Sequence, residues 1–322
     1  MTDVSEIVVV VPALNEERHI VACLESLLCH DPDLTVIVAD GGSTDRTRDL
    51  VIGLTARFPN LRVHHNPARL QSAGINGAVA ALATPAHRIV VRCDAHAQYF
   101  TGFVKAVAAA LDNQGVGSVV VPMDSVGDTG FGRAAAWIVD KPLGSGGSAH
   151  RGGQTSGPVD HGHHAGMDLG WFRRIGGYDP TFSHNEDAEY DHRLLQAGGS
   201  IWMQSDIRLN YVMRPTFQTL ARQYWLYGRG RARTVLKHRM RPKLRQLIPA
   251  INLIGMVVAL ILGLVWPWAL VWPLAYISAL VLVSGAGIRA IGTDGAWAGP
   301  ALFAMHNFWA AGFLRQIAQA RA

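Results

Sequence analysis

Charge is distributed very unevenly along this chain of 322 residues, and that asymmetry limits how the chain can fold. Residues 1–212 contain 16 Lys and Arg against 23 Asp and Glu. Residues 213–245 contain 10 Lys and Arg and no acid, and charge nearly vanishes after residue 245. The sequence therefore predicts an acidic globular domain over 1–212, a basic segment over 213–245 and an apolar region over 246–322.

The apolar region predicts membrane helices. Leu247 to Trp266 and Ala269 to Ile288 are each about twenty residues long and nearly free of charge, which is the length that spans a bilayer. Ala296 to Leu314 predicts a third span, although His306 and Asn307 interrupt it. We therefore expect two to three transmembrane helices and a lipid bilayer as a partner.

The basic segment favours a membrane surface over nucleic acid. A basic segment directly before an apolar region is typical of the cytoplasmic edge of a membrane, where anionic lipid attracts it. A nucleic-acid partner would leave the apolar region unexplained, so none is expected. Residues 216–236 have apolar positions near helical spacing, which predicts an amphipathic helix in the bilayer interface. A purely electrostatic lipid anchor is the alternative.

The amino terminus lacks the features of a secretory signal. It has acids before a short apolar run and no basic region, so the first domain is expected in the cytoplasm and the protein in the inner membrane as a multi-pass protein. Cys23, Cys29 and Cys93 fall in no Cys-x-x-Cys pattern, which fits a reducing compartment.

Strands and helices are predicted to alternate through the first domain. Short runs of mainly apolar residues predict strands at 7–12, 35–39, 88–93 and 118–121, and a further strand is predicted at residues 61–65. Helices are expected between them, after Asn15 and over residues 70–83 and 100–111. This alternation is typical of a Rossmann-like α/β fold with a mostly parallel sheet.

Acids stand at the ends of two of these strands. Asp40 is suited to hydrogen-bond the base or ribose of a nucleotide, and Asp94 with His96 is suited to hold a divalent ion on a phosphate. Neither a GxGxxG nor a Walker motif, which would bind phosphate through backbone N–H groups, is present. A metal ion on Asp94 is therefore expected to neutralise the charge of a diphosphate. The alternative for Asp94 is a loop acid that caps the next helix.

A glycine- and serine-rich stretch, residues 141–158, is too polar for a regular element and predicts a mobile lid, with a plain surface loop as the alternative. Three histidines follow in VDHGHHAG. Strand alternation would point His161 and His163 to one side and His164 to the other, and no cysteine lies nearby, which disfavours a zinc site. One of the three is expected to line an acceptor or diphosphate pocket.

The stretch HNEDAEYDHRLLQAG predicts a helix that Gly198 ends. Glu186 and Asp187 would lie in its first turn, where acids complement the helix dipole. However, four acids between Glu186 and Asp191 repel one another, and such crowding raises the pKa of a carboxylate towards that of a useful general base. A general base for a sugar hydroxyl is therefore the preferred interpretation.

The motifs VPALNEE, ADGGSTDRT, DAH and HNEDAEYDHRL occur here in that order. Together they resemble the family 2 inverting glycosyltransferases of GT-A fold. The strings VDHGHHAG and YGRGRAR add a similarity to the ExoA-type glucosyltransferases of succinoglycan assembly. This resemblance covers residues 5–245. It implies a UDP-sugar donor, Mn²⁺ or Mg²⁺ as cofactor, and an acceptor saccharide linked to polyprenyl diphosphate.

The resemblance also implies roles for individual residues. The positions assigned to nucleotide-sugar binding are Pro12, Glu16, Asp40, Asp94 and either Arg229 or Arg231. Asp94 and His96 match the metal motif, and Asp187, beside Glu186, matches the catalytic base. The acceptor pocket is assigned to His161, His163 and His164 from the histidine cluster itself and not from the resemblance. Two positions depart from the pattern: His96 replaces a commoner Asp, and Leu14 stands where many members have Tyr.

The expected function is transfer of a hexose, glucose in β-linkage, to a lipid-linked glycan during exopolysaccharide assembly. Two alternatives remain open. The first is a non-catalytic membrane-bound sensor of nucleotide sugars, which would need the donor-binding residues but no base. The second is a glycosyltransferase that acts on polyprenyl phosphate itself.

Overall fold

The computed structural model describes residues 3–147 and 153–320, which form two compact units. The first unit combines Met1–Met123 with Gly153–Leu209, and the second combines Asp124–Gly152 with Asn210–Ala322. The units thus differ from the three predicted regions, because a segment from the middle of the chain joins the carboxyl-terminal helices through a shared apolar core.

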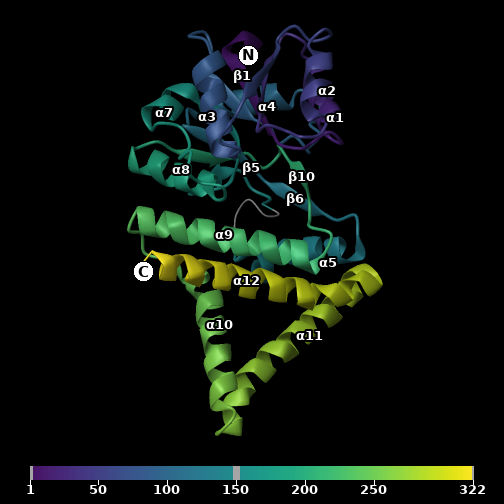
Figure 1. The fold of residues 1–322 in the computed structure, drawn as a ribbon, viewed down its shortest axis with the longest axis vertical. Helices are drawn as coiled ribbons and strands as arrows, with labels where there is room; N and C mark the ends of the chain where they lie inside the picture. The colour runs from purple at the N-terminus through teal and green to yellow at the C-terminus, as the bar shows by residue number, and fades with distance from the viewer. Residues whose placement is uncertain (1–2, 148–152, 321–322) are drawn as a thin grey trace. The chain divides into compact units, whose positions relative to one another are not determined.

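A mostly parallel sheet forms the centre of the first unit (Figure 1). Among the described residues it has eight strands, in the spatial order β3 Leu61–His65, β2 Thr35–Asp40, β1 Ile7–Ala13, β4 Ile89–Arg92, β8 His163–Asp168, β5 Ser118–Val121, β9 Ile201–Met203 and β7 Gly157–Pro158. The first four strands of this order pair in parallel. Strand β8 runs antiparallel to β4 and β5. The predicted α/β sheet is confirmed.

Helices cover both faces of this sheet. One face packs against α1 Ile20–Leu28, α2 Thr47–Leu54 and α4 Phe103–Gln114, and the other against α3 Gln71–Leu82, α7 Leu169–Arg174 and α8 Glu186–Gln196. Successive side chains of β1 alternate between the two cores: Val9 and Val11 point to one, Val8 and Val10 to the other. A strand buried on both faces needs an apolar residue at every position, which explains the uninterrupted valine run.

The first predicted helix begins later than expected. Asn15 has a positive φ of 57°, and its side-chain oxygen accepts a hydrogen bond from the backbone N–H of Thr44 at 2.8 Å. It therefore joins the loop after β1 to the loop after β2 and does not cap α1, which starts at Ile20. Glu16 consequently lies in a loop beside the sheet edge and not in a helical turn.

In the second unit, β6 Met123–Val126 pairs with β10 Leu209–Val212. The longer helices are α5 Gly130–Val139, α9 Phe217–Lys237, α10 Leu244–Leu262, α11 Val271–Ile291 and α12 Ala298–Gln319. A short helix, α6 Pro142–Ser145, falls within the predicted lid, so part of that stretch does form a regular element, started by a proline at its first turn. Residues 148–152 of the predicted lid lie outside the described residues.

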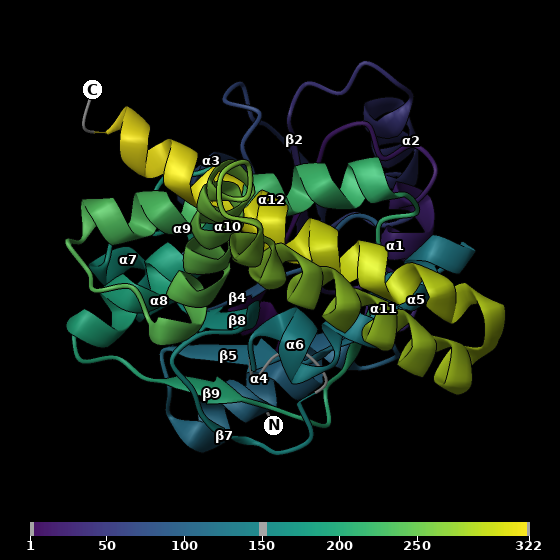
Figure 2. The same ribbon diagram turned by 90° about the horizontal axis from the view of Figure 1, so that it is seen from below.

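Helices α9 and α12 lie side by side and run in the same direction (Figure 2). Their contact depends on two glycines. A Cβ atom added at Gly228 would lie 2.0 Å from the carbonyl oxygen of Trp309, and one added at Gly312 would lie 2.1 Å from that of Trp225. Backbones can approach this closely only where no side chain intervenes. The contact extends to Phe217, whose ring stacks on Phe303.

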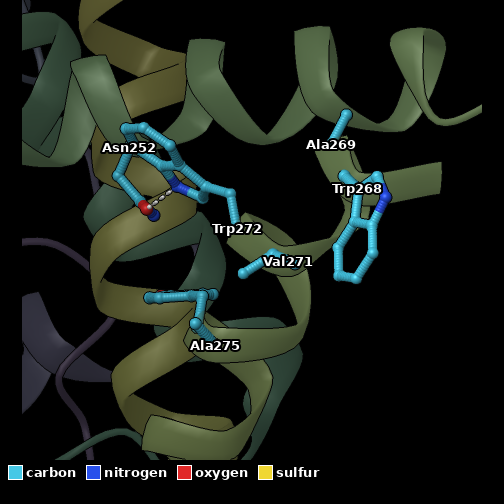
Figure 3. A pocket seen from close by; sticks show the side chains of 7 residues that line it. Asn252, Trp268, Ala269, Val271, Trp272 and Ala275 are labelled. Atoms are coloured by element: carbon cyan, nitrogen blue, oxygen red, sulfur yellow. Dashed lines mark hydrogen bonds between the residues drawn. The ribbon is translucent and has the colours of Figure 1, made fainter. Parts of the chain in front are cut away.

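Helices α10 and α11 form a hairpin that leaves the α9–α12 pair steeply (Figure 1). Between them, near the hairpin tip, is a hollow of about 630 Å³ lined by Asn252, Trp268, Ala269, Val271, Trp272, Ala275 and Tyr276 (Figure 3). Trp272 Nε1 donates a hydrogen bond to Asn252 Oδ1 at 3.1 Å. Most of the large hydrophobic side chains that the described residues expose belong to this hairpin and its flanks, from Leu244 to Trp297.

Only one helical run in the described part of the chain, Pro267–Gln319, is long and apolar enough to cross a membrane, with a mean hydropathy of 1.9 over a stretch of 18 residues within it. Residues 246–262 are apolar but shorter. The prediction of two to three transmembrane helices is therefore not confirmed. The third predicted span, Ala296 to Leu314, falls almost entirely in α12, whose small and apolar side chains are largely buried within the second unit.

Candidate active site

The carboxyl ends of β1 and β2 meet at one edge of the sheet. Ala13 pairs with Asp40 in register, and the side chain of Asp40 is almost fully buried. Its Oδ1 atom accepts hydrogen bonds from the backbone N–H and the hydroxyl of Ser43, at 3.1 and 2.6 Å. Pro12 lies half-buried on the same strand. Leu14 is 43% exposed at this edge, where it offers an aliphatic surface and no aromatic ring.

Glu16 and His96 lie close to each other at this edge, although the sequence motifs assign them different roles. Glu16 Oε1 is 3.6 Å from His96 Nδ1, and Glu16 Oε2 is 3.1 Å from His19 Nδ1. Burial raises the pKa of Glu16, but the hydrogen bonds and charges of the two histidines outweigh it and lower that pKa overall. Glu16 is thus an ionised acceptor beside the predicted metal motif.

Asp94 lies close to the carboxyl end of β4, as expected, with Cys93 between it and the last strand residue. Its backbone N–H donates to the hydroxyl of Tyr99 at 2.6 Å, and its side chain is 23% exposed. Burial raises the pKa of Asp94, yet the charges of Arg92, His163 and His96 lower it overall. An ionised carboxylate at an accessible strand end is a suitable ligand for a hard divalent cation.

The residues present fit a metal ion that is shared with a substrate. Among the described residues, no group of three or more His, Cys, Asp or Glu side chains could hold a metal ion alone. Mg²⁺ is usually held by one or two carboxylates, with substrate phosphates and water supplying the other ligands. Asp94 and His96 together match that sparse arrangement, so the predicted metal site stays a prediction.

Helix α8 begins with the two predicted acids. Glu186 is buried, and burial raises its pKa, with the neighbouring Asp187 adding to the rise and Arg92 opposing it. Asp187 is half-buried, and its Oδ1 accepts from the backbone N–H of Ala188 at 2.8 Å. Burial, more than crowding, is therefore the main cause of the raised pKa, and the group affected is Glu186.

The other acids of α8 have cationic or histidine partners, which relieves the predicted crowding. Glu189 pairs with Arg193 one turn later, at 2.7 Å. Asp191 accepts from His161 Nδ1 at 2.8 Å and from His164 Nε2 at 2.7 Å. A sequence motif shows the run of acids but not the partners that arrive from other elements.

Arg92 is a site residue that the motifs did not identify. It is the last residue of β4, its side chain is 7% exposed, and its Nε is 3.7 Å from Asp94 Oδ1. Its Nη1 is 3.5 Å from Glu186 Oε1, and this atom has no hydrogen-bond partner among the described residues. The signal was available in the sequence, because an arginine inside a buried strand is rare unless it is paired.

The three histidines do not alternate as predicted. His161 and His164 both contact Asp191, whereas His163 Nε2 is 3.6 Å from Asp94 Oδ2. The reason is that β8 begins only at His163, so His161 lies in the preceding loop and is not bound by strand alternation. His164 is fully buried, while the side chain of His161 is 27% exposed. The structure thus divides them between the Asp94 side and the α8 side.

The predicted arginines of the basic segment belong to the second unit. Arg229 and Arg231 lie on α9, and Arg229 Nε donates to Gln316 Oε1 of α12 at 3.2 Å. Their predicted contact with a donor diphosphate stays a prediction.

Comparison with known proteins now decides the family. Residues 8–176 match the family model described as Glycosyl transferase family 2. The chain belongs to this family. Over 317 residues it is 40% identical to the succinoglycan biosynthesis protein ExoA of Rhizobium meliloti (strain 1021), covering 96% of this chain and 94% of ExoA. The resemblance drawn from the motifs is therefore confirmed, and the family 2 domain coincides with most of the first unit's sheet.

Solved structures confirm the fold. The mannosyltransferase PcManGT from Pyrobaculum calidifontis, solved with GDP-Man and Mn²⁺, has a TM-score of 0.62 at 18% identity, covering 97% of this chain and 87% of that one. Residues 1–349 of TarS from S. aureus have a TM-score of 0.50 at 15% identity, covering 98% and 91%. This family 2 chain therefore has the GT-A fold that its motifs predicted.

Proposed function

We propose that this chain is a membrane-anchored inverting glycosyltransferase. It moves a hexose from a UDP-sugar to a saccharide on polyprenyl diphosphate during exopolysaccharide assembly, and glucose in β-linkage is the expected hexose. The relationship to ExoA supports the exopolysaccharide role. The donor sugar and the acceptor follow from the motifs and are the finer parts of the proposal.

One observation supports this activity most strongly. Arg92 lies between Asp94, on the predicted donor side, and Glu186, at the start of the acid helix, with ion-pair distances of 3.7 and 3.5 Å. Asp94 and Glu186 are 92 residues apart in the sequence. The fold therefore brings a diphosphate-side carboxylate and a candidate base into one cluster, as transfer between two substrates requires.

The reaction follows from this arrangement. Asp187 accepts the proton of an acceptor hydroxyl, and that oxygen attacks the anomeric carbon of the donor from the face opposite the diphosphate. The bond from the anomeric carbon to the diphosphate oxygen breaks as the new glycosidic bond forms, so the configuration inverts. Asp40 and Glu16 hold the nucleoside, and the half-exposed His161 lies on the acceptor side.

Asp94 and His96 are the residues that would hold a divalent ion, Mn²⁺ or Mg²⁺. When bound, the ion neutralises the negative charge of the departing diphosphate. PcManGT, which shares the fold, was solved with Mn²⁺. Arg92 and the nearby His163 keep Asp94 ionised, which is the protonation state that a metal ligand needs.

A second relative supports a lipid-linked acceptor. The dolichyl N-acetyl-α-D-glucosaminyl phosphate 3-β-D-2,3-diacetamido-2,3-dideoxy-β-D-glucuronosyltransferase of Methanococcus voltae is 23% identical over 245 residues, covering 71% of this chain. The acceptor in that name is a sugar phosphate on a long isoprenoid lipid. Such an acceptor stays in a bilayer, so an enzyme that uses it gains from an anchor there.

The α10–α11 hairpin is the proposed anchor. Its helices have 19 and 21 residues, which correspond to about 28 and 31 Å at about 1.5 Å per residue. The hydrocarbon core of a bilayer is about 30 Å thick. The exposed apolar side chains of this hairpin would contact lipid tails. The basic residues that precede the hairpin would bind anionic headgroups.

The direct test is a transfer assay on membranes that contain the protein. Labelled UDP-sugars, with GDP-mannose as a comparison donor, are incubated with a panel of polyprenyl-diphosphate saccharides and with polyprenyl phosphate. We expect label in the lipid-soluble fraction with a UDP-hexose and a saccharide acceptor. Label on polyprenyl phosphate alone would move the assignment to the simpler acceptor, and binding of donor without any transfer would support the sensor.

A further inference from the structure

A chain of buried hydrogen-bonded side chains leads to the helix of the predicted base. Asp191 Oδ1 on α8 accepts from His164 Nε2 at 2.7 Å, and His164 Nδ1 is 2.6 Å from the hydroxyl of Tyr178. One ring nitrogen of His164 thus contacts Asp191 and the other contacts the hydroxyl of Tyr178. The charge of Arg92 favours ionised Tyr178 and so partly offsets burial, which raises the pKa of Tyr178.

Every link of this chain is removed from solvent. His164 and Tyr178 are 0% exposed, Asp191 is 1% exposed, and Arg92 is 7% exposed. Buried polar groups are costly unless each is satisfied, and once satisfied they fix a unique geometry. Arg92, which faces both Asp94 and Glu186, is a neighbouring charge of Tyr178. The hydrogen-bonded chain itself runs from Tyr178 through His164 to the helix of the predicted base.

Asp191 ties the network to the base itself. It is four residues after Asp187, so the two acids lie on the same face of α8 one turn apart. A shift of Asp191 along the helix axis would move Asp187 by a similar amount. The bonds to His161 and His164 hold Asp191 from two sides, because His161 comes from the loop before β8 and His164 from β8 itself.

We propose that Tyr178 is a positioning residue for sugar transfer: its hydroxyl holds His164, and His164 holds Asp191 on the helix of the predicted base. The inference rests on the proposed function and deepens it. Tyr178 touches no reacting atom. Its hydroxyl fixes the position of Asp191 through His164, and its loss leaves His164 Nδ1 without that partner in a fully buried place.

The same aromatic cluster provides a matched control. Tyr190 is also 0% exposed, its ring centroid is 5.0 Å from that of Tyr178, and its ring packs edge-on against His164 at 5.1 Å. Its hydroxyl, however, has no hydrogen-bond partner among the described residues. Tyr178→Phe and Tyr190→Phe therefore remove the same atom from neighbouring buried rings, and only the first cuts the network.

The experiment compares Tyr178→Phe, Tyr190→Phe and the unaltered protein in three measurements: kcat and KM for transfer, donor affinity by calorimetry, and thermal stability. We expect kcat of Tyr178→Phe to fall by on the order of tenfold to a hundredfold, the effect of a small misplacement of reacting groups. Its donor affinity should stay within about a factor of two of that of Tyr190→Phe. Its melting temperature should stay within a few degrees of that of Tyr190→Phe. Tyr190→Phe should keep normal kcat.

A fourth measurement does not need turnover. Proton NMR should show a far-downfield ring N–H resonance for His164 bonded to Asp191, shifted in Tyr178→Phe and unchanged in Tyr190→Phe. If the unaltered protein transfers no sugar, the proposed function fails while this signal still reports the network. The positioning role would be overturned if both variants had equal kcat. It would also be overturned if Tyr178→Phe lost stability and kcat in parallel, or if the His164 resonance were absent.

Discussion

At the scale of single residues, the donor side of the proposed site depends on Asp94. Its carboxylate faces Arg92 and His163 and remains partly accessible, so it combines an ionised state with an open side. Most other acids at the sheet edge already have protein donors, as Asp40 has in Ser43. Asp94 is therefore the acid best placed to bind an ion that arrives with its substrate.

We predict that Asp94→Ala removes measurable Mn²⁺ or Mg²⁺ dependence of donor binding and abolishes transfer, because a hard cation on a diphosphate needs an anionic oxygen ligand. Calorimetric titration of donor with and without metal measures this directly. Asp49→Ala, at an exposed position on α2, is the control and should leave both quantities unchanged. Full transfer in EDTA would show that neither Asp94 nor His96 holds a metal.

His96→Asp gives a complementary prediction. Imidazole favours softer ions than carboxylate does, so the variant should keep activity and shift its preference from Mn²⁺ towards Mg²⁺. The side chain of His96 is 53% exposed, which leaves room for the change without repacking. The ratio of transfer rates in the two metals is the measurement. An unchanged ratio would place His96 outside the coordination sphere and leave it as a partner of Glu16.

The sequence motifs located the acids of the proposed site, but they did not show which residues pair with those acids. Asp40, Asp94 and Glu186 stand in recognisable motifs and lie at the sheet edge or at the start of α8, as expected. Arg92 and Tyr178 were missed, since the contacts that define them come from elements far apart in the chain. A pattern along the sequence reports what a residue can do, whereas the partners that set its charge depend on tertiary packing.

At the scale of elements, the contact of α9 with α12 holds the second unit together. Gly228→Ala should destabilise this unit by about 1–3 kcal/mol, because the added methyl group meets the Trp309 backbone and forces the helices apart. Gly285→Ala on α11 is the matched control, since a Cβ there meets nothing within 4 Å. It should be neutral or stabilising by up to about 1 kcal/mol. Chemical denaturation in detergent compares the two variants.

Equal stability of the two variants would show that the close approach of α9 and α12 is not needed for folding. Gly312→Ala tests the same contact from the other helix, where the added Cβ would meet Trp225. Because both glycines serve one interface, the double variant should lose less stability than the sum of the single losses.

The elements that could be predicted best were the buried strands. Residues 118–121 form a fully buried strand with the predicted bounds, since a short β-branched apolar run has few other structures open to it. Residues 61–65 also form a strand with the predicted bounds, although only Leu61 is buried there. The predicted start of α1 was wrong, because the side chain of Asn15 accepts a hydrogen bond from the backbone N–H of Thr44 and does not cap the helix. The sequence indicated a strand through the histidines, but neither its start at His163 nor its antiparallel direction was predicted, because two histidines and a glycine give no clear strand pattern.

At the scale of the whole molecule, the proposed anchor makes a topological prediction. The basic residues before α10 favour the cytoplasmic side, so tags at the amino terminus and after Arg245 should be cytoplasmic, and a tag between Trp266 and Trp272 should lie on the opposite side. The packing of α12 along α9, a helix rich in arginine, favours two crossings and a cytoplasmic carboxyl terminus. Accessibility of the tags to an impermeant reagent measures each position.

A cytoplasmic tag between Trp266 and Trp272 would contradict the spanning hairpin. It would mean that α10 and α11 lie in one leaflet as an interfacial or re-entrant hairpin. A carboxyl terminus on the far side would restore α12 as a third span.

The central claim is that Asp187 acts as the base of a glycosyltransferase, and Asp187→Asn tests it most directly. Asparagine has nearly the same shape, but it cannot accept the proton of the acceptor hydroxyl. Donor affinity, measured by calorimetry with metal, should stay nearly unchanged, while transfer to lipid-linked acceptor should fall at least about a hundredfold. Near-normal transfer by this variant would contradict the account and make Glu186 the next candidate for the base.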